Sequence, residues 1–296
     1  MQKIAKGLMV LLVSAGLTSA HNPPGELFFL FQFPDNAVPT IDGDLSDWSV
    51  VPDTRTYVIR SDRLYDPAQF HEAGRGELDL SDFNPLHILG WNENFNKLYF
   101  ANQVFDNIHN TDREDPARHW DDDNWEVEVN PTHLAADEQN LSDEPVNRIA
   151  YKWVVPPIEG VYQSLEPIGN LAWLSDGGDF TSYGWSFDGD QFGESTYYYE
   201  LGITPIAEIP REGATPDNIE IYDLEEEDII HISINNGDID APQSDHAYQG
   251  FWGTTPESSN IALNDFVLAP LEEGIDFSST SVEAISWGQL KSSLGR

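Results

Sequence analysis

Aspartate and glutamate are the residues that most limit which partners this chain can bind. Of its 296 residues, 52 are aspartate or glutamate and only 14 are lysine or arginine, so the formal net charge is -38. Crowded carboxylates repel one another, which favours divalent cations or a salty medium, and a plain adaptation of the surface to salt predicts the same charge. Such a surface also repels nucleic acids and anionic membranes, whereas a neutral glycan meets no repulsion. We therefore expect no nucleic-acid partner.

No residue pattern typical of a known catalytic centre is present. The sequence has no Ser-His-Asp motif, no P-loop and no zinc-ligand spacing. A glycoside hydrolase needs two carboxylates about 5–9 Å apart, and a chain with 52 acidic residues neither nominates nor excludes such a pair. Both methionines, Met1 and Met9, lie in the amino-terminal segment, which leaves no methionine to ligate haem. These patterns favour a binding protein over an enzyme, without excluding an enzyme.

The first twenty residues are typical of a secretory signal peptide. Lys3 and Lys6 precede an apolar stretch, residues 7–17, that is too short to span a bilayer. Small residues at 18–20 suit cleavage by a signal peptidase. We expect residues 1–20 to be removed and the remainder to be secreted, either to the periplasm or outside the cell, with no membrane attachment afterwards.

Cleavage after Ala20 would make His21 the amino terminus. An amino-terminal histidine with a second histidine resembles the copper site of the lytic polysaccharide monooxygenases, although the rest of the chain does not resemble them. The alternatives are a copper-dependent polysaccharide oxidase that uses His21 and a histidine that merely follows the cleavage site.

The elements that must position any site are predicted to be strands. Short segments rich in aromatic and β-branched residues recur between turn residues, and residues 125–129 alternate apolar and acidic side chains. No long segment keeps a 3.6-residue period, and strands do not alternate with helices, which disfavours a parallel doubly wound sheet. We predict an all-β fold, a two-sheet antiparallel β-sandwich of the jelly-roll kind with long loop insertions. The expected strands are 87–91, 97–104, 125–129, 148–155, 197–203, 229–234 and 265–269, and the expected loops are 53–85, 135–147, 155–195 and 204–228.

One domain accounts for most of the chain. Residues 21–271 are expected to form the sandwich, and residues 272–296 form a polar tail with a small apolar group that is expected to dock as a terminal strand or helix. The chain has no cysteine, so core packing and bound metal must replace disulfides in an exported protein.

Seven segments, in order along the chain, resemble the family-9 carbohydrate-binding modules. The first, residues 41–48, reads Ile-Asp-Gly-Asp-Leu-Ser-Asp-Trp and combines a turn with an acidic rim and a tryptophan. The others are residues 89–100, 104–106, 120–131, 199–203, 232–236 and 264–268. The resemblance spans about residues 40–269 and implies a sandwich that binds a sugar. Related sandwiches bind haem or act as spacers, so the fold alone does not decide the ligand.

The resemblance implies a site for a sugar ring. Trp120 would stack on the ring, and Glu126 and Arg148 would bind its hydroxyls. Physical chemistry supports these roles. The C–H face of a pyranose packs on an indole, and vicinal hydroxyls form hydrogen bonds with a carboxylate or a guanidinium. The alternative is that Arg148 pairs with a carboxylate and Trp120 packs in the core.

One feature departs from the family pattern. A second stacking tryptophan is expected in the loop before the last strand, but residues 253–260 contain no aromatic residue. The nearest is Trp252, which would either replace it from a shifted loop or belong to a strand.

The resemblance also implies structural calcium. Calcium takes six to eight oxygen ligands, mostly from carboxylates and carbonyls. Asp106, Asp121, Asp122 and Asp123 are the candidate ligands. We therefore expect a secreted carbohydrate-binding module that recognises a plant- or algal-type polysaccharide or its oligosaccharides and assists a partner glycoside hydrolase. The alternative is a non-binding acidic scaffold domain of an extracellular assembly.

Overall fold

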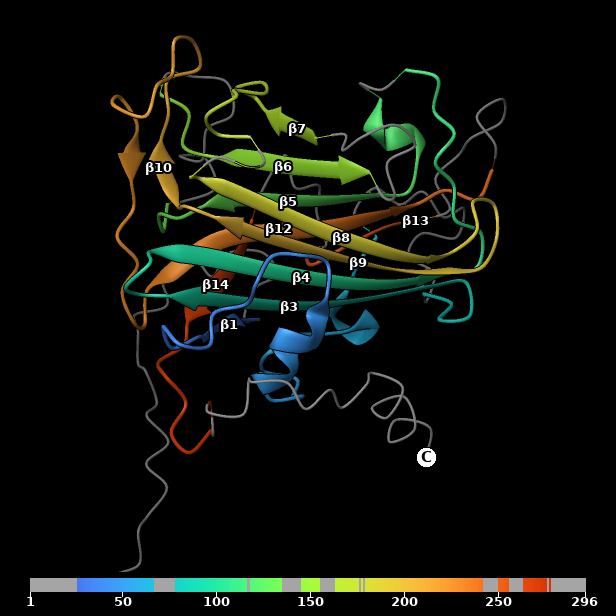
Figure 1. Cartoon of the computed structure of the whole chain (residues 1–296), viewed down its shortest axis with the longest axis horizontal. Helices are drawn as coiled ribbons and strands as arrows, with labels where there is room; N and C mark the ends of the chain where they lie inside the picture. Colours follow the sequence, from blue (N-terminus) through green and yellow to red (C-terminus); the bar gives the residue numbers. More distant parts are fainter. Residues whose placement is uncertain are drawn as a thin grey trace, which may run out of the picture.

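Strands form nearly all of the regular structure, as the short apolar segments predict (Figure 1). The computed structural model describes residues 26–66, 78–115, 118–134, 145–154, 163–175, 177, 179–241, 250–255, 263–275 and 277. The predicted signal segment, with His21, and most of the tail lie outside these residues. Among the described residues, no helix combines the length and the hydropathy that a membrane span requires. The elements are β1 (Phe28–Gln32), η1 (Leu45–Val50), β2 (Val58–Ile59), η2 (Ser61–Arg63), β3 (Phe83–Asn92), β4 (Lys97–Asp106), η3 (His119–Asp121), β5 (Asn124–Asn130), β6 (Ile149–Val154), β7 (Gln163–Glu166), β8 (Thr181–Gly189), β9 (Ser195–Ile203), β10 (Ile206–Glu208), β11 (Glu220–Ile221), β12 (Ile229–Asp238), β13 (Gly250–Gly253) and β14 (Asn264–Leu268).

Two layers of strands are joined along β1. The first, which we call layer A, has the order β7-β6-β5-β12-β14, with β13 beside β12. The second, layer B, has the order β3-β4-β9-β8, with β2 beside β3. Phe28, Phe29 and Leu30 pair with β14, whereas Phe31 and Gln32 pair with β3, both in parallel. The predicted all-β sandwich is confirmed, and β1 departs from antiparallel pairing because β14 and β3 both run in its own direction.

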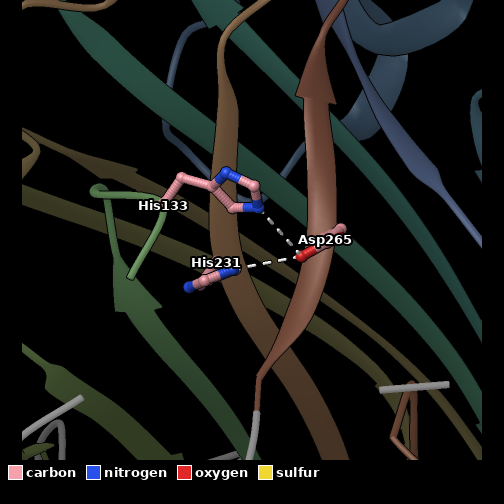
Figure 2. A group of neighbouring side chains, drawn as sticks. All are labelled: His133, His231 and Asp265. Carbon is pink, nitrogen blue, oxygen red and sulfur yellow. Dashed lines mark hydrogen bonds and ion pairs between the residues drawn. The ribbon is translucent and has the colours of Figure 1, made fainter. Parts of the chain in front are cut away.

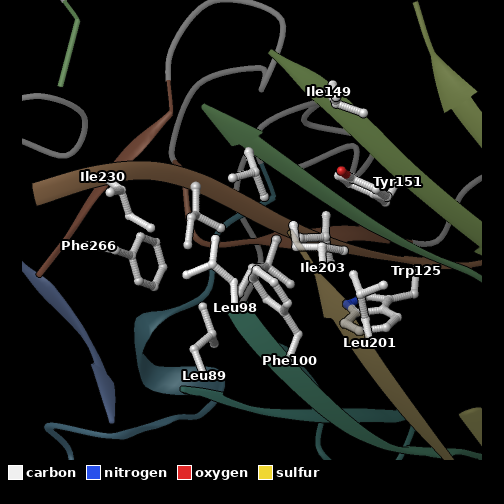
Figure 3. Packing of buried hydrophobic residues seen from close by; sticks show 14 of the residues in the cluster. Leu89, Leu98, Phe100, Trp125, Ile149, Tyr151, Leu201, Ile203, Ile230 and Phe266 are labelled. Atoms are coloured by element: carbon white, nitrogen blue, oxygen red, sulfur yellow. The ribbon is translucent and has the colours of Figure 1, made fainter. Parts of the chain in front are cut away.

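The core fills the space between the two layers. Alternate residues of a strand face opposite sides, and Trp125, Val127 and Val129 of β5 all belong to the buried apolar cluster. Trp125 stacks on Tyr199 of β9, with ring centroids 5.0 Å apart. Figure 3 shows that layer A and layer B both contribute to this cluster. Truncating a ring such as that of Trp125 to alanine would cost roughly 3–5 kcal/mol.

The first motif, residues 41–48, fastens a turn onto β9. The Glu200 carboxylate accepts the Trp48 Nε1 hydrogen at 2.7 Å and the backbone N–H groups of Asp42 and Gly43 at 2.9 and 2.6 Å. Gly43 has φ of +88°, and a Cβ there would lie 2.3 Å from the Trp185 carbonyl carbon. Only glycine fits both constraints, so this motif has a structural role.

Five strands occur where loops were expected, and one of them is β2 in residues 53–85. Residues 155–195 contain β7 and β8, and β8 pairs with β9 over Thr181–Gly189. The expectation was wrong because the stretch 181–189 mixes polar, aromatic and glycine residues, as an edge strand with one solvated face does. Residues 204–228 likewise contain the small sheet of β10 and β11.

Candidate functional site

The face of layer A that points away from the core is polar and largely buried. Along β5, Glu126 and Glu128 alternate with the core residues, and they are only 6% and 2% exposed. On the neighbouring strands, Lys152 lies opposite Glu126 in β6 and Asn235 lies opposite it in β12. Sheet faces that point outward are normally solvated, so the charged groups of this shielded face must pair with one another. We call this surface the polar face.

The charged side chains of the polar face come from three neighbouring strands, β5, β6 and β7. The Lys152 ammonium lies 3.5 Å from a Glu126 oxygen and 3.2 Å from an oxygen of Glu166 in β7. Burial alone would lower the pKa of Lys152, but Glu126, Glu166 and Glu128 together raise it above its ordinary value. Lys152 therefore remains a charged donor, while the half-exposed Glu166 gives access from solvent.

Arg148 pairs with Glu128 rather than with Glu126. It lies just before β6, is 1% exposed, and donates to one Glu128 oxygen through Nε at 2.7 Å and through Nη2. Arg148 and Glu126 therefore share the polar face, and each has an opposite charge of its own beside it.

Trp120 lies at the surface and not in the core. It belongs to the short helix η3 and is 42% exposed. The guanidinium carbon of Arg118 lies 5.8 Å from the Trp120 ring centroid, and the same Arg118 pairs with Asp121 at 2.7 Å. Because η3 contacts β6, the exposed indole lies at the β6 side of layer A. This position suits stacking on a flat apolar ligand face.

Trp252 does not offer a ring face to solvent. It lies in β13 opposite Asn236, is 2% exposed, and packs in the core cluster. Of the two outcomes left open by the sequence, the strand position is the one observed.

A second cluster, of carboxylates, takes residues from both layers. Asp106 ends β4 of layer B, whereas Asp123 precedes β5 and Asp238 ends β12 of layer A. The oxygens of Asp106, Asp238 and Asp240 lie within 4.8 Å of one another, and so do ligand atoms of Asp106, His109 and Asp123. We call Asp106, Asp123, Asp238 and Asp240 the acidic junction.

Buried like charges make the acidic junction a candidate cation site. Burial, and after it the neighbouring Asp123, raises the pKa of Asp106 to about 9. Burial, with Asp82 and Asp106, raises the pKa of Asp240 to about 7, and one Asp240 oxygen is buried without a hydrogen-bond partner. A bound divalent cation removes this type of penalty, because it favours the ionised form of each carboxylate. The oxygen-rich donor set fits calcium.

The four aspartates nominated from the sequence do not all meet. Asp106 and Asp123 belong to the acidic junction. Asp122 instead accepts hydrogen bonds from the backbone of Asp112 and Arg113 and pairs with the Arg113 guanidinium, while Asp121 pairs with Arg118.

Sequence reasoning missed Asp238 and Asp240 of the acidic junction. They follow Asn235-Asn-Gly237, which was interpreted only as a turn, but β12 continues through this tripeptide to Asp238. The strand runs four residues beyond the predicted end at 234, and this brings both aspartates to the same end of the sandwich as Asp106.

Comparison with known proteins gives similarity of fold only. No protein-family model matches the sequence, and no curated protein matches it. The chain is similar to a family-9 carbohydrate-binding module from Caldicellulosiruptor kristjanssonii, solved in complex with glucose, with 13% identity, 85% of this chain and 100% of that chain covered, and a TM-score of 0.49. It is also similar to a candidate carbohydrate-binding protein from Bacteroides uniformis, with 10% identity, 82% and 99% covered, and a TM-score of 0.43.

Proposed function

We propose that this protein is a secreted carbohydrate-binding module that recognises a plant- or algal-type polysaccharide or its oligosaccharides and assists a partner glycoside hydrolase. The observation that carries the proposal is the exposed indole of Trp120 on η3, beside a strand that bears a charged donor and its carboxylate partners. An indole face and paired charged groups are the two elements that a neutral sugar requires.

In this proposal each residue has a distinct role. Trp120 stacks on the C–H face of a sugar ring, and Lys152, Glu126 and Glu166 bind hydroxyls. Glu166 is the most accessible of the three, so the ligand enters from the β7 side. Arg148, whose guanidinium already bonds Glu128, acts as a positioning residue beneath the site.

The same protein would need calcium for its fold. The acidic junction supplies carboxylate oxygens from both layers, with no disulfide elsewhere in the chain to replace the cation. Bound calcium would neutralise the junction and hold β4 against β5 and β12. It takes no part in the sugar contacts proposed above.

Burial on the polar face favours a second candidate function, a non-binding acidic scaffold domain. Glu126 and Arg148 are almost inaccessible, and Trp252 lies in the core. In a scaffold the buried charges would only neutralise one another, and the acidic surface would keep the assembly soluble.

Glycan binding separates these two functions. The full chain is first applied to an array of plant and algal polysaccharides, with and without calcium chloride. Calorimetric titration with xylo- and cello-oligosaccharides then compares the parent with Trp120→Ala. Loss of a stacking ring should weaken binding by about 1–3 kcal/mol, judged from anchor residues at other interfaces, with an unchanged melting temperature.

Phe95→Ala is the matched control, because Phe95 is an aromatic residue of similar exposure in the turn between β3 and β4. It should bind like the parent. If no glycan binds, or if Trp120→Ala binds like the parent, the module proposal fails and the scaffold function is favoured.

A further inference from the structure

Two histidines and an aspartate form a separate group on layer A. They are His133, His231 and Asp265 (Figure 2). In the β5–β12 pairing, His231 lies opposite Asn130, whereas Glu126 lies opposite Asn235. Four residues along a strand span about 13 Å, so this group is distinct from the charges around Lys152.

Strand register brings His231 and Asp265 together. They are directly opposite each other on the antiparallel strands β12 and β14, and opposed residues project from the same face of a sheet. His231 Nε2 lies 3.1 Å from Asp265 Oδ1. His231 is fully buried and Asp265 is 7% exposed, so both side chains are fixed by their surroundings.

A turn after β5 brings in the third residue. The Asn130 side-chain oxygen accepts hydrogen bonds from the Thr132 backbone N–H at 2.9 Å and from the Thr132 hydroxyl at 2.6 Å. This turn directs the chain back over β12, and His133 Nε2 lies 3.8 Å from Asp265 Oδ1. The two imidazole rings have centroids 5.1 Å apart.

The ligand atoms of the three residues lie close enough together to bind one metal ion. They lie within 4.8 Å of one another. A tetrahedral zinc ion with bonds of about 2.0–2.1 Å holds its ligand atoms roughly 3.3–3.4 Å apart. The separations of 3.1 and 3.8 Å from Asp265 Oδ1 fall on either side of this value. A shift of about half an ångström in His133, the most exposed member, would bring its separation from Asp265 Oδ1 to this value.

The donor types select the kind of metal. Imidazole nitrogen suits zinc and other first-row transition metals, whereas calcium and magnesium prefer oxygen alone. We propose that His133, His231 and Asp265 bind one zinc ion through two nitrogens and one oxygen. The half-exposed His133 leaves the fourth position facing solvent, for water or a small ligand. The metal would fasten the segment after β5 onto β12 and β14.

The test is calorimetric titration of the full chain with zinc chloride, in saturating calcium chloride so that the acidic junction is filled. The expected result is one zinc ion per chain, retained in the presence of calcium. His133→Ala should weaken zinc binding at least about tenfold, since even outer-shell partners of metal ligands are worth that much. Because His133 is half-exposed, the circular dichroism of this variant should match that of the parent.

His119→Ala, in η3, is the matched control, and His21→Ala excludes binding at the amino terminus. Both should bind zinc like the parent, and cobalt should give a visible absorption band that only His133→Ala removes. The proposal is overturned if zinc does not bind, if His133→Ala binds like the parent, or if either control variant or Asp123→Asn abolishes binding. It is also overturned if His133→Ala lowers the melting temperature equally with and without zinc, because the three residues would then be an ion-pair network alone.

Discussion

At the scale of single residues, the Arg148–Glu128 pair determines how the polar face is built. Both side chains are almost fully buried, and Arg148 bonds one Glu128 oxygen through two nitrogens. A buried charge that loses its partner does not regain its hydration, so removal of one member costs more than removal of both. The pair therefore holds the start of β6 against β5, while its net contribution to the free energy of unfolding is small.

Replacing one member should be worse than replacing both. Arg148→Met is expected to lower the free energy of unfolding by about 3–5 kcal/mol, because Glu128 is left as an unpaired buried charge. The double variant Arg148→Met/Glu128→Leu should recover most of this loss. Urea unfolding of the parent, both single variants and the double variant gives the coupling energy. Additive losses in the double variant would contradict the argument.

The same double variant tests whether Arg148 contacts the glycan. If Arg148 only positions Glu128, the double variant should still bind a glycan through Trp120, within about tenfold of the parent. If the guanidinium itself holds a hydroxyl, binding should fall by about 1.5–3 kcal/mol. Calorimetric titration at a temperature where both proteins are folded distinguishes the two.

At the scale of elements, the turn at residues 41–48 depends on one buried carboxylate of β9. Burial raises the pKa of Glu200 to about 7, although hydrogen bonds from Trp48, Asp42 and Gly43 act in the opposite direction. This folded-state pKa exceeds the ordinary value of 4.5. The protonated group therefore favours the folded state below about pH 4.5, and that contribution is lost as the pH rises through 7.

Stability should respond to pH through this residue. In saturating calcium, the urea midpoint of the parent is expected to fall between pH 5 and pH 8. Glu200→Gln is neutral at both values, so its midpoint should fall less. Glu93→Gln, in an exposed turn, is the control and should follow the parent. Equal pH dependence in Glu200→Gln would contradict the assignment.

Local pattern predicted some elements and not others. The alternation in residues 125–129 predicted β5 and its buried face, since a period of two has one physical cause. β8 also alternates, with Tyr183, Trp185 and Phe187 between small or polar residues, but the glycine and aspartate residues in and beside it favoured a loop. The acidic face of β5 was expected to be unlike the core, but its burial depends on what covers it, which no local pattern reports.

The residues of the candidate sites also divide into those that local sequence pattern predicts and those that it does not. Trp120 is exposed, and Asp106 and Asp123 lie in one cluster, while their roles in binding a sugar and calcium stay predictions. Asp238 and Asp265 could not be found in this way, because their partners come from strands distant in sequence and only the register brings them together. Long-range pairing therefore sets most of the site chemistry in this fold.

At the scale of the whole molecule, the acidic junction connects the two layers. Asp106 comes from layer B, and Asp123 and Asp238 come from layer A. Without a cation, like charges oppose the packing of one layer on the other. With a cation, the same groups become ligands shared across the sandwich. The net charge of -38 makes this opposition stronger at low ionic strength.

Calcium should therefore reverse the effect of Asp238→Asn on the stability of the protein. At fixed ionic strength, calcium at a hundred times its dissociation constant is expected to stabilise the parent by about 2.7 kcal/mol. In EDTA, Asp238→Asn should be more stable than the parent, because it removes a buried like charge. In calcium it should be less stable, because a ligand is lost. Melting curves check both, with exposed Asp217→Asn as control. An unchanged parent melting temperature on adding EDTA would contradict structural calcium.

The double pairing of β1 has a consequence for the order of events in folding. This strand precedes every other described strand, and its partner β14 follows every other one. Closing so long a loop is slow, since chain entropy is lost before the contact is made. We expect the edges of β3 and β14 to stay open until late, exposed to pairing with other chains. Pulsed hydrogen exchange during refolding should protect Phe28–Gln32 after β4 and β9, and early protection would contradict this order.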